Sequence, residues 1–252
     1  MSAEINRLAS RLVGVRRVLF ITGAGISADS GLPTYRGVGG LYDDDTETED
    51  GLSIEEALSG ECLIARPEIT WKYLAQIQRN CRQVEPNAAH YSIARLENDL
   101  DVTVLTQNID GLHLRAGSTR VIEIHGSLAS RHCMKCGAST DVDSPLLPPK
   151  CERCDGIVRP DVVLFGEALP QAALHRLDQE YAKGFDAVVV VGTTAMFPYI
   201  AEPVLHAIRC KTPTIEINPA QTSLSGMVDF HLPMRASVAV PMLSELLSAG
   251  CR

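Results

Sequence analysis

Two closely spaced pairs of cysteines are the strongest metal-binding signal in the chain. Each pair has the C-x-x-C spacing, Cys133 with Cys136 and Cys151 with Cys154. Four thiolates fill every position of a tetrahedral zinc site and leave none for water or substrate. The set therefore predicts one structural Zn2+, with the chemistry elsewhere in the chain. His132 lies beside the first cysteine and could replace a thiolate, but the complete set of four makes this the weaker interpretation.

A glycine-rich turn follows the first apolar run of the sequence. Its letters, GAGISA from Gly23 to Ala28, have the G-x-G-x-x-A spacing. Glycines at these places allow a tight turn and the close approach of a pyrophosphate, whose charge meets the N-terminus of the next helix. The turn therefore predicts a dinucleotide site. The acidic residue that usually holds the ribose is missing, because the expected distance falls at Asp43–Asp45 with no strand before it. We expect the dinucleotide to be held and used differently from a hydride carrier.

The elements that must position these motifs alternate along the chain. Short β-rich runs bounded by turn residues predict buried parallel strands at 18–22, 102–106, 121–124, 187–191, 214–217 and 229–232. Helical patterns lie between them at 68–82, 88–96, 171–182 and 200–208. Strands that alternate with helices predict an α/β fold with a Rossmann-like, doubly wound parallel sheet and right-handed crossovers.

Two stretches interrupt this alternation and predict a smaller second lobe. Residues 37–61 are acidic and glycine-rich, and residues 127–160 carry the cysteines among many turn residues. We expect a large Rossmann-like domain made from residues 1–36, 86–126 and 161–252. The small lobe is expected to combine a helical insert at 37–85 with a zinc module at 127–160.

The composition indicates a globular protein with an ample core and argues against several classes of partner. Of 252 residues, 45% are apolar, and the formal net charge is -8. An acidic chain without a Lys/Arg run argues against a broad grip on nucleic acid or anionic membrane. No apolar run approaches the ~20 residues of a membrane span, and residues 1–12 do not resemble an export signal. The remaining cysteines are scattered, which favours a reducing cytoplasm; they are Cys62, Cys81, Cys210 and Cys251.

Several longer motifs occur in the order of one enzyme family. The string GAGISADSGLPTYRG spans Gly23–Gly37, and TQNIDGLH spans Thr106–His113. The pair His125-Gly126, the four cysteines, RPDVVLFGE at 159–167, GTT at 192–194 and Ile217-Asn218 follow. Together these motifs cover nearly the whole chain. They resemble the sirtuins, the NAD-dependent protein deacylases, in a bacterial-type form that consists of the short catalytic core.

The resemblance implies both the fold and the reaction. In sirtuins a Rossmann-type domain binds NAD, a small zinc lobe packs beside it, and an acyl-lysine enters a tunnel between them. The amide oxygen attacks the nicotinamide ribose, which expels nicotinamide and forms an alkylimidate. The acyl group is then transferred to ADP-ribose. A histidine acts as general base on the ribose hydroxyls. By motif this base is His125, and Asn108 and Asp110 complete the catalytic set.

The same resemblance assigns the binding residues. Cofactor contacts are expected from Gly23, Ala24, Gly25, Tyr35, Arg36, Gln107, Asn108, Asp110, Gly192, Thr193, Thr194, Asn218 and Ala236. An acyl-lysine peptide is expected to add as a strand to the backbone of Val163, Phe165, Gly166 and Glu167.

Elementary chemistry agrees with these roles. Imidazole is suited to act as a base near neutral pH, because its unperturbed pKa of ~6.5 keeps it mostly neutral. Loss of nicotinamide develops positive charge on the ribose, so pocket groups should order the ring and exclude water until the amide oxygen attacks. His113 is the competing histidine, and we interpret it as structural.

Two positions of the cofactor loops depart from the family pattern. The aromatic residue before Arg36 is Tyr35 where the family has Phe, which keeps the ring, so activity should survive. The proline after Gly192-Thr193-Thr194 is Pro198, which arrives one residue early. This leaves the geometry of the 192–198 loop open.

A third departure concerns the acyl group. The branch of the family that removes succinyl or malonyl groups has a Tyr-x-x-Arg pair in the helical insert, which binds the acyl carboxylate. Alignment on Trp71 puts Leu74 and Ile77 at those places. Because burial of an unpaired carboxylate is costly, we expect a preference for acetyl or longer apolar acyl groups.

Other functions would use the same residues differently. Mono-ADP-ribosyl transfer to a protein shares the loss of nicotinamide and differs only in the acceptor. A non-catalytic NAD- or zinc-dependent binding module gains no support, because His125, Asn108 and Asp110 are all present. A dehydrogenase is disfavoured by the missing ribose acid and by the cysteine lobe. We expect a monomer that acts on acyl-lysine proteins or peptides and binds neither nucleic acid nor membrane.

Overall fold

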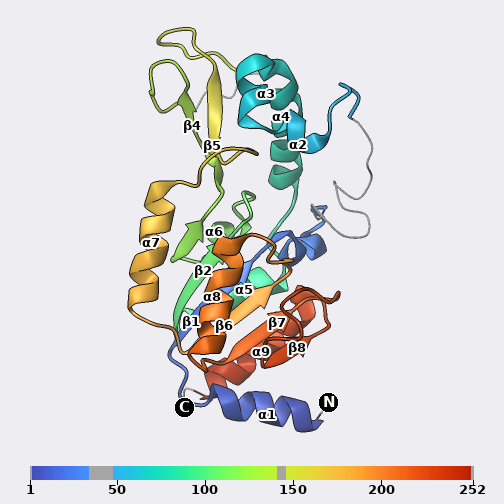
Figure 1. Ribbon diagram of the computed structural model, residues 1–252, viewed down its shortest axis with the longest axis vertical. Coiled ribbons are helices and arrows are strands. Elements are labelled where there is room, and N and C mark those ends of the chain that lie inside the picture. Colours follow the sequence, from blue (N-terminus) through green and yellow to red (C-terminus); the bar gives the residue numbers. More distant parts are fainter. Residues whose placement is uncertain (1, 34–47, 141–145, 251–252) are drawn as a thin grey trace.

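The computed structural model describes residues 2–33, 48–140 and 146–250, and a six-stranded parallel sheet forms its centre (Figure 1). The strand order is β3-β2-β1-β6-β7-β8. The strands are β1 (Arg17–Thr22), β2 (Asp101–Thr106), β3 (Val121–Glu123), β6 (Ala187–Val191), β7 (Thr214–Ile217) and β8 (Phe230–Leu232). The order reverses between β1 and β6. In open α/β sheets the crevice at such a switch point receives ligands.

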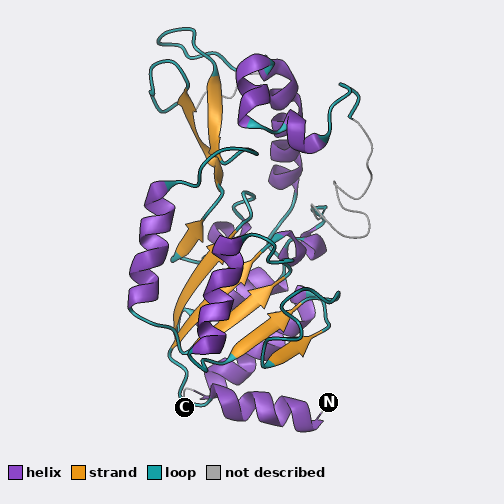
Figure 2. Ribbon diagram, in the orientation of Figure 1, coloured by secondary structure: helices purple, strands orange, loops and turns teal. Residues whose placement is uncertain are grey.

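Alternate side chains of the strands fill two separate cores. On β1, Val18 and Phe20 belong to one core, and Leu19 and Ile21 belong to the other. The first face is covered by α1 (Ser2–Leu12), α5 (Ala88–Leu96) and α9 (Ala236–Gly250), and the second by α7 (Gln171–Ala182) and α8 (Pro198–Arg209) (Figure 2). Burial on both faces explains why these strands are almost continuously apolar.

A smaller lobe stands at one end of the molecule (Figure 1). It contains the antiparallel pair β4 (Gly126–Cys133) and β5 (Val158–Val162), and the helices α2 (Ile54–Ala57), α3 (Gly60–Ala65) and α4 (Pro67–Gln83). Trp71 of α4 lies in the core of this lobe, and its indole N–H donates a 2.9 Å hydrogen bond to the carbonyl of Val158. One aromatic side chain thus joins the helical insert to the β4–β5 pair.

Local chemistry explains where the helices near the crevice begin. Asn87 caps α5, because its side-chain oxygen accepts from the N–H of Ala89 at 3.0 Å. Ser59 caps α3 in the same way through the N–H of Cys62. Pro198 stands at the start of α8, where its missing N–H costs nothing. Two single turns, η1 (Ala24–Ile26) and η2 (Ala28–Ser30), follow β1, and α6 (Leu112–Arg115) follows β2.

The α/β fold with a doubly wound parallel sheet is confirmed, and each predicted strand and helix forms within two residues of its expected bounds. The sequence analysis missed α1, α9 and the β4–β5 pair. The expected domain boundaries stay a prediction; β4 and β5 pair from Gly126 to Val162, slightly beyond the expected zinc module. Within the described ranges, no helix combines the length and apolar character needed to cross a bilayer.

Candidate active site

The turns that follow β1 and β6 are pressed together at the switch point. The N–H of Gly25 donates to the carbonyl of Gly192 at 2.8 Å, and the N–H of Gly23 donates to Val191 at 3.1 Å. A Cβ on Gly25 would lie 2.6 Å from the Cα of Gly192, so no larger residue fits without a backbone shift. Gly192 also has φ +59°, in the left-handed region that favours glycine. The glycines predicted from the sequence therefore meet each other directly.

A cavity of about 880 Å3 opens at these turns and extends to the small lobe. Most residues assigned from the sequence line it: Gly23, Ala24, Gly25, Gln107, Asn108, His125, Val163, Phe165, Gly166, Glu167, Gly192, Thr193, Thr194, Asn218 and Ala236. Tyr35, Arg36 and the acidic Asp43–Asp45 stretch lie outside the described residues. Asp110 lines a smaller adjoining pocket.

His125 follows β3 and is held at both ring nitrogens. Its Nδ1 lies 2.9 Å from the carbonyl oxygen of Gln107, and its Nε2 lies 2.7 Å from the hydroxyl of Tyr199. Burial holds the pKa of His125 below its ordinary value, and the hydrogen bond to Gln107 offsets part of this effect. The imidazole is therefore neutral near pH 7, as a general base must be.

The TQNID segment links the two glycine turns. The side-chain amide of Asn108 donates to the carbonyl of Gly23 at 3.1 Å and contacts the hydroxyl of Ser27 at 3.2 Å. Gln107 donates from Nε2 to the hydroxyl of Thr193 at 2.7 Å. Asn108 is 4% exposed, so its amide is a fixed part of the wall. The side chains of Gln107 and Asn108 thus form hydrogen bonds within the protein and also line the cavity.

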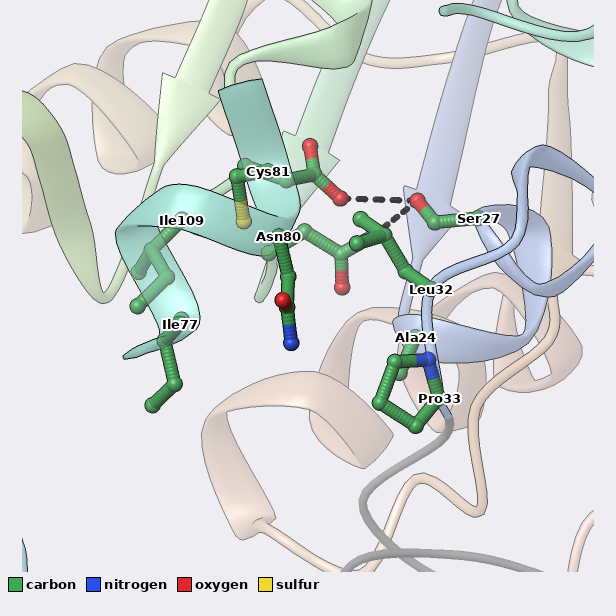
Figure 3. A pocket seen from close by; sticks show the side chains of 10 residues that line it. Ala24, Ser27, Leu32, Pro33, Ile77, Asn80, Cys81 and Ile109 are labelled. Carbon is green, nitrogen blue, oxygen red and sulfur yellow. Dashed lines mark hydrogen bonds between the residues drawn. The ribbon is translucent and has the colours of Figure 1, made fainter. Parts of the chain in front are cut away.

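Asp110 lines a pocket of about 40 Å3 beside the main cavity, shown in Figure 3. The hydroxyl of Ser27 donates to one carboxylate oxygen at 2.7 Å, and the N–H of Leu112 donates to the other at 2.9 Å. Burial raises the pKa of Asp110, against the effect of these two hydrogen bonds. In Figure 3, Asn80 and Cys81 of α4 stand opposite Ser27 across the pocket. This arrangement is suited to a small polar ring or amide group.

The segment after β5 approaches the cavity from the small lobe. The N–H of Val163 donates to the carbonyl of His125 at 2.8 Å. The N–H and carbonyl of Phe165 are both paired, with Leu58 and Gly60, at 3.0 Å each. The backbone groups of Phe165 are therefore paired within the chain, and the docking of a substrate strand along residues 163–167 stays a prediction.

Glu167 fixes the shape of this segment. Its carboxylate accepts two hydrogen bonds from Arg159, at 2.5 and 2.8 Å, and one from the N–H of Leu164 at 2.9 Å. A bidentate pair of this kind is among the stronger polar contacts in proteins. The Glu167 carboxylate thus holds residues 163–167 in place, a role that the sequence analysis did not foresee.

The far end of the cavity lies over β7 and α9. Asn218 donates from Nδ2 to the carbonyl of Thr193 at 3.3 Å, and Ala236 lines the wall beside it. Glu216 is fully buried on β7 and accepts hydrogen bonds from Thr222 and Ser225 at 2.5 Å each. The buried carboxylate therefore fastens the 218–225 loop, part of which lines this end of the cavity.

The four cysteines come together as expected. Their sulfur atoms all lie within 4.8 Å of one another, and those of Cys133 and Cys154 are 3.4 Å apart. Sulfurs bound to a tetrahedral zinc at about 2.3 Å would be separated by about 3.8 Å. Hydrogen bonds from the N–H groups of Cys136 and Lys135 hold the pKa of Cys133 below its ordinary value, which favours a thiolate at this position. The cluster fits a structural zinc.

His132 does not join this cluster. Its Nδ1 contacts the carboxylate of Asp161, and the group of possible metal ligands consists of the four cysteines alone among the described residues. No disulfide joins the described cysteines. The interpretation of the quartet as a complete ligand set therefore agrees with the geometry.

His113 is fully buried away from the cavity. Its Nε2 lies 2.9 Å from the hydroxyl of Thr22, and its ring packs edge-on against His90 at 4.9 Å. Burial lowers the pKa of His113, and that of His90 falls to about 4 for the same reason. Both rings are neutral members of the packing between α5 and α6, which agrees with the structural interpretation of His113.

Sequence reasoning missed Tyr199 and Ser27. Tyr199 lines the cavity and contacts His125, yet it belongs to none of the sequence motifs. The available signal was the early Pro198, which stands at the start of α8 directly before Tyr199. Ser27 stood inside the glycine-rich string, but its spacing gave no reason to expect bonds to Asn108 and Asp110.

Comparisons with known proteins agree with this geometry. The sequence pattern of the Sir2 family matches residues 23–197. The chain is 51% identical to the NAD-dependent protein deacylase 2 of Pseudomonas aeruginosa over 96% of both chains, and 38% identical to the NAD-dependent protein deacylase 2 of Pyrobaculum aerophilum over 94% of both.

Solved structures agree as well. A Sir2 homologue in complex with NAD shares a TM-score of 0.85 and 34% identity, covering 98% of this chain and 95% of its own. A Sir2 structure with a p53 peptide and NAD+ shares a TM-score of 0.80 and 28% identity, over 97% and 98% of the two chains. These matches span nearly the whole molecule. The chain belongs to the Sir2 family, the sirtuins.

Proposed function

We propose that this protein is an NAD-dependent protein-lysine deacylase that releases nicotinamide and forms O-acyl-ADP-ribose. The position of His125 carries the proposal. Its imidazole lines one cavity together with the glycine turns on one side and residues 163–167 on the other. The relatives named as NAD-dependent protein deacylases support the activity.

The residues that would hold NAD lie along the large-domain half of the cavity. Gly23 and Gly25 line the cavity beside Gly192, and a glycine-rich turn of this kind suits the close approach of a pyrophosphate. Asn218 and Ala236 line the end that suits the adenosine part. When bound, NAD supplies an electrophilic ribose carbon and nicotinamide as the leaving group.

Asn108 and Asp110 are suited to the nicotinamide end. Asn108 is fixed by its bonds to Gly23 and Ser27, and Ser27 also fixes Asp110. Fixed polar groups in a small, water-poor pocket can orient a carboxamide-bearing ring without reorganisation. We assign these two residues to orientation of the reacting ring and His125 to proton removal.

His125 has the properties required of the base. Burial keeps its imidazole neutral, and the Gln107 carbonyl fixes the hydrogen on Nδ1, so that the lone pair lies on Nε2. The Nε2 atom faces Tyr199 in the cavity wall. A ribose hydroxyl reaching Nε2 would lose its proton there while the acyl group is transferred.

The small-lobe end of the cavity is apolar and suits an uncharged acyl chain. Its walls there are formed by Leu58, Leu74, Ile77, Ile109, Val162, Leu164 and Phe165. Arg235 is the only lysine or arginine among the described lining residues, and its guanidinium is paired with Asp29 at 2.8 Å near α9. We therefore propose acetyl and longer apolar acyl-lysines as the substrates, presented on proteins or peptides.

Product analysis tests this function directly. The purified protein is incubated with NAD and an acetyl-lysine peptide, and the products are identified by mass spectrometry. We expect nicotinamide, the free lysine peptide and O-acetyl-ADP-ribose in equal amounts. A stable ADP-ribose adduct on protein, without peptide deacetylation, would instead identify a mono-ADP-ribosyltransferase that uses the same site.

We also propose that the protein is a monomer and that it is located in the cytoplasm. Its two lobes are proposed to have the boundaries given in the sequence analysis. The scattered cysteines, none of which forms a disulfide among the described residues, suit a reducing compartment. Sedimentation of the purified protein would test the monomer.

A further inference from the structure

The contact between His125 and Tyr199 involves the only lone pair that the base can offer. The carbonyl of Gln107 can only accept a hydrogen bond, so Nδ1 of His125, 2.9 Å away, carries the hydrogen. In the neutral imidazole the lone pair therefore lies on Nε2. The Tyr199 hydroxyl, 2.7 Å from Nε2, must then be the donor. The atom that should receive a proton from substrate already accepts one hydrogen bond from the protein.

Tyr199 is held on one side and open to the cavity on the other. It is the second residue of α8, so its backbone is fixed, and its ring stacks on Phe197 with centroids 5.3 Å apart. Both rings pack edge-on against His125, at 5.8 and 6.0 Å. Phe197 is 41% exposed and both residues line the cavity, whereas the Tyr199 ring also packs against the core beneath α8, so its hydroxyl can turn away from His125 only toward the cavity.

We propose that the Tyr199 hydroxyl occupies the place on His125 that a ribose hydroxyl of NAD takes during turnover, so that Tyr199 and the cofactor compete for one nitrogen. This inference rests on the proposed function, because it takes His125 as the base. Tyr199 is then a positioning residue. It holds the imidazole ring in its working orientation and tautomer before the cofactor arrives, and it moves aside when the ribose binds.

A proton relay through Tyr199 is the alternative, and the geometry favours it less. In a relay the ribose hydroxyl would pass its proton to the phenol oxygen while the phenol passes its own to Nε2. Burial raises the pKa of Tyr199, which makes its oxygen a poorer site from which to lose a proton. A general base also works best in direct contact with the proton that it removes. Competition requires only rotation of one side chain.

The charged groups around His125 do not replace this contact. Glu123 precedes it on β3 and Asp110 follows Gln107; burial raises the pKa of both carboxyl groups. Glu167, which also lines the cavity, is bound by Arg159. Burial lowers the pKa of His125 and the hydrogen bond to the Gln107 carbonyl raises it, with no contribution from either carboxyl group. Loss of the phenol donor, which is in direct contact with Nε2, should therefore be visible in the titration of His125.

The test compares Tyr199→Phe with Tyr181→Phe. The first variant keeps the ring on Phe197 and removes only the hydroxyl; the second removes a buried hydroxyl from α7 that has no hydrogen-bond partner in the described part of the structure. Competition predicts that Tyr199→Phe binds NAD about fivefold more tightly, the ratio that one ordinary hydrogen bond gives. KM for NAD should fall accordingly, kcat should stay within about twofold, and Tyr181→Phe should match the wild type.

The pH profiles give a second readout that packing damage would not imitate. A donor to the neutral imidazole lowers its pKa, so its removal raises the pKa of His125 in the free enzyme. The acidic limb of kcat/KM for NAD, which reports the free enzyme, should move up by about half a pH unit in Tyr199→Phe. The acidic limb of the pH profile of kcat reports the enzyme with NAD bound. It should not move, because in that complex Tyr199 no longer contacts His125.

Three results would overturn the proposal. They are a fall in kcat of tenfold or more at all pH values, which indicates a relay; unchanged NAD affinity; and an unchanged acidic limb of kcat/KM. Calorimetric binding of NAD and the imidazole 15N spectrum of His125 do not depend on turnover. If the wild type binds NAD but lacks deacylase activity, the proposed function fails, while these two measurements still decide whether Tyr199 competes with the cofactor.

Discussion

Gly25 and Gly192 meet backbone to backbone, with a hydrogen bond of 2.8 Å between the N–H of one and the carbonyl of the other. This contact joins the turn after β1 to the turn after β6, strands that are adjacent in the sheet but distant in sequence. It brings the floor of the cofactor site to the switch point of the fold. The NAD site therefore depends on the absence of two Cβ atoms.

We expect Gly25→Ala to lower kcat/KM for NAD by more than tenfold. The added Cβ would lie 2.6 Å from the Cα of Gly192, so one turn must move away, at a cost of about 1–3 kcal/mol in stability. Steady-state kinetics and thermal unfolding measure the two effects. Gly226→Ala is the matched control, because a Cβ there meets nothing within 4 Å. Equal kinetics for Gly25→Ala and the wild type would disprove the close approach.

Removal of zinc should unfold the small lobe before the large domain. Cys133, Cys151 and Val158 form its metal-side core, and Trp71, the single tryptophan of the chain, donates to the Val158 carbonyl. A strong chelator should therefore shift tryptophan emission to longer wavelength and abolish peptide turnover.

The matched variants are Cys151→Ser and Cys210→Ser. The first removes a ligand and should reproduce the effect of the chelator; the second alters an exposed cysteine outside the cluster and should keep one zinc per chain. Metal analysis measures the zinc. Unchanged emission and activity after complete zinc loss would show that the metal is dispensable for the lobe.

The apolar end of the cavity predicts the order of acyl substrates. Acetyl- and butyryl-lysine peptides should react at least tenfold faster than succinyl-lysine, because no described lining cation is available to pair with the succinyl carboxylate there. Ile77→Arg should raise the ratio of succinyl to acetyl rate, whereas Gln76→Arg, which adds the same charge on an exposed position of α4, should not. A dominant succinyl rate in the wild type would exclude this assignment.

Stability should fall as the solution is acidified, because two histidines are buried in neutral form. Burial lowers the pKa of His90 to about 4, below the ~6.5 of an unfolded chain. Between these values the unfolded state binds more protons, so the free energy of unfolding decreases as pH falls, by about 3 kcal/mol at most from His90. His113 acts in the same direction.

Urea unfolding at several pH values measures this dependence. His90→Gln keeps a side chain suited to the third position of α5 and removes the titrating ring, so its unfolding free energy should vary less between pH 6.5 and 4. If the unfolding free energy of the variant and of the wild type changed equally with pH, His90 would not be a source of the pH dependence.

Strands with continuous apolar runs, such as Ala187–Val191, were predictable because burial on both faces leaves a strong local signal. The helix α9 escaped because Pro241 lies inside it and it carries few charged residues to mark an exposed face. The β4–β5 pair escaped because β5 is only five residues long with Pro160 at its centre, and because the burial pattern of β4 is irregular. Local apolar patterns therefore gave no clear signal for this pair.

The residues of the site also fall into those that the sequence predicted and those that it did not. The glycine turns and His125 belong to contiguous motifs, so their sequence alone indicated them. The contact of Tyr199 with His125 and the fixation of Glu167 by Arg159 depend on which loops meet in three dimensions. The spacing of residues along the chain does not predict these contacts, which are seen only in the folded structure.

The deacetylation rate of His125→Ala, measured with NAD and an acetyl-lysine peptide, tests directly whether His125 is the catalytic base. A general base contributes about 10²–10⁴-fold, so the rate should fall at least ~100-fold, while thermal unfolding and NAD binding stay near those of the wild type. Deacetylation at the wild-type rate would contradict the assignment of His125 as the base, and loss of folding in the variant would indicate a structural role instead.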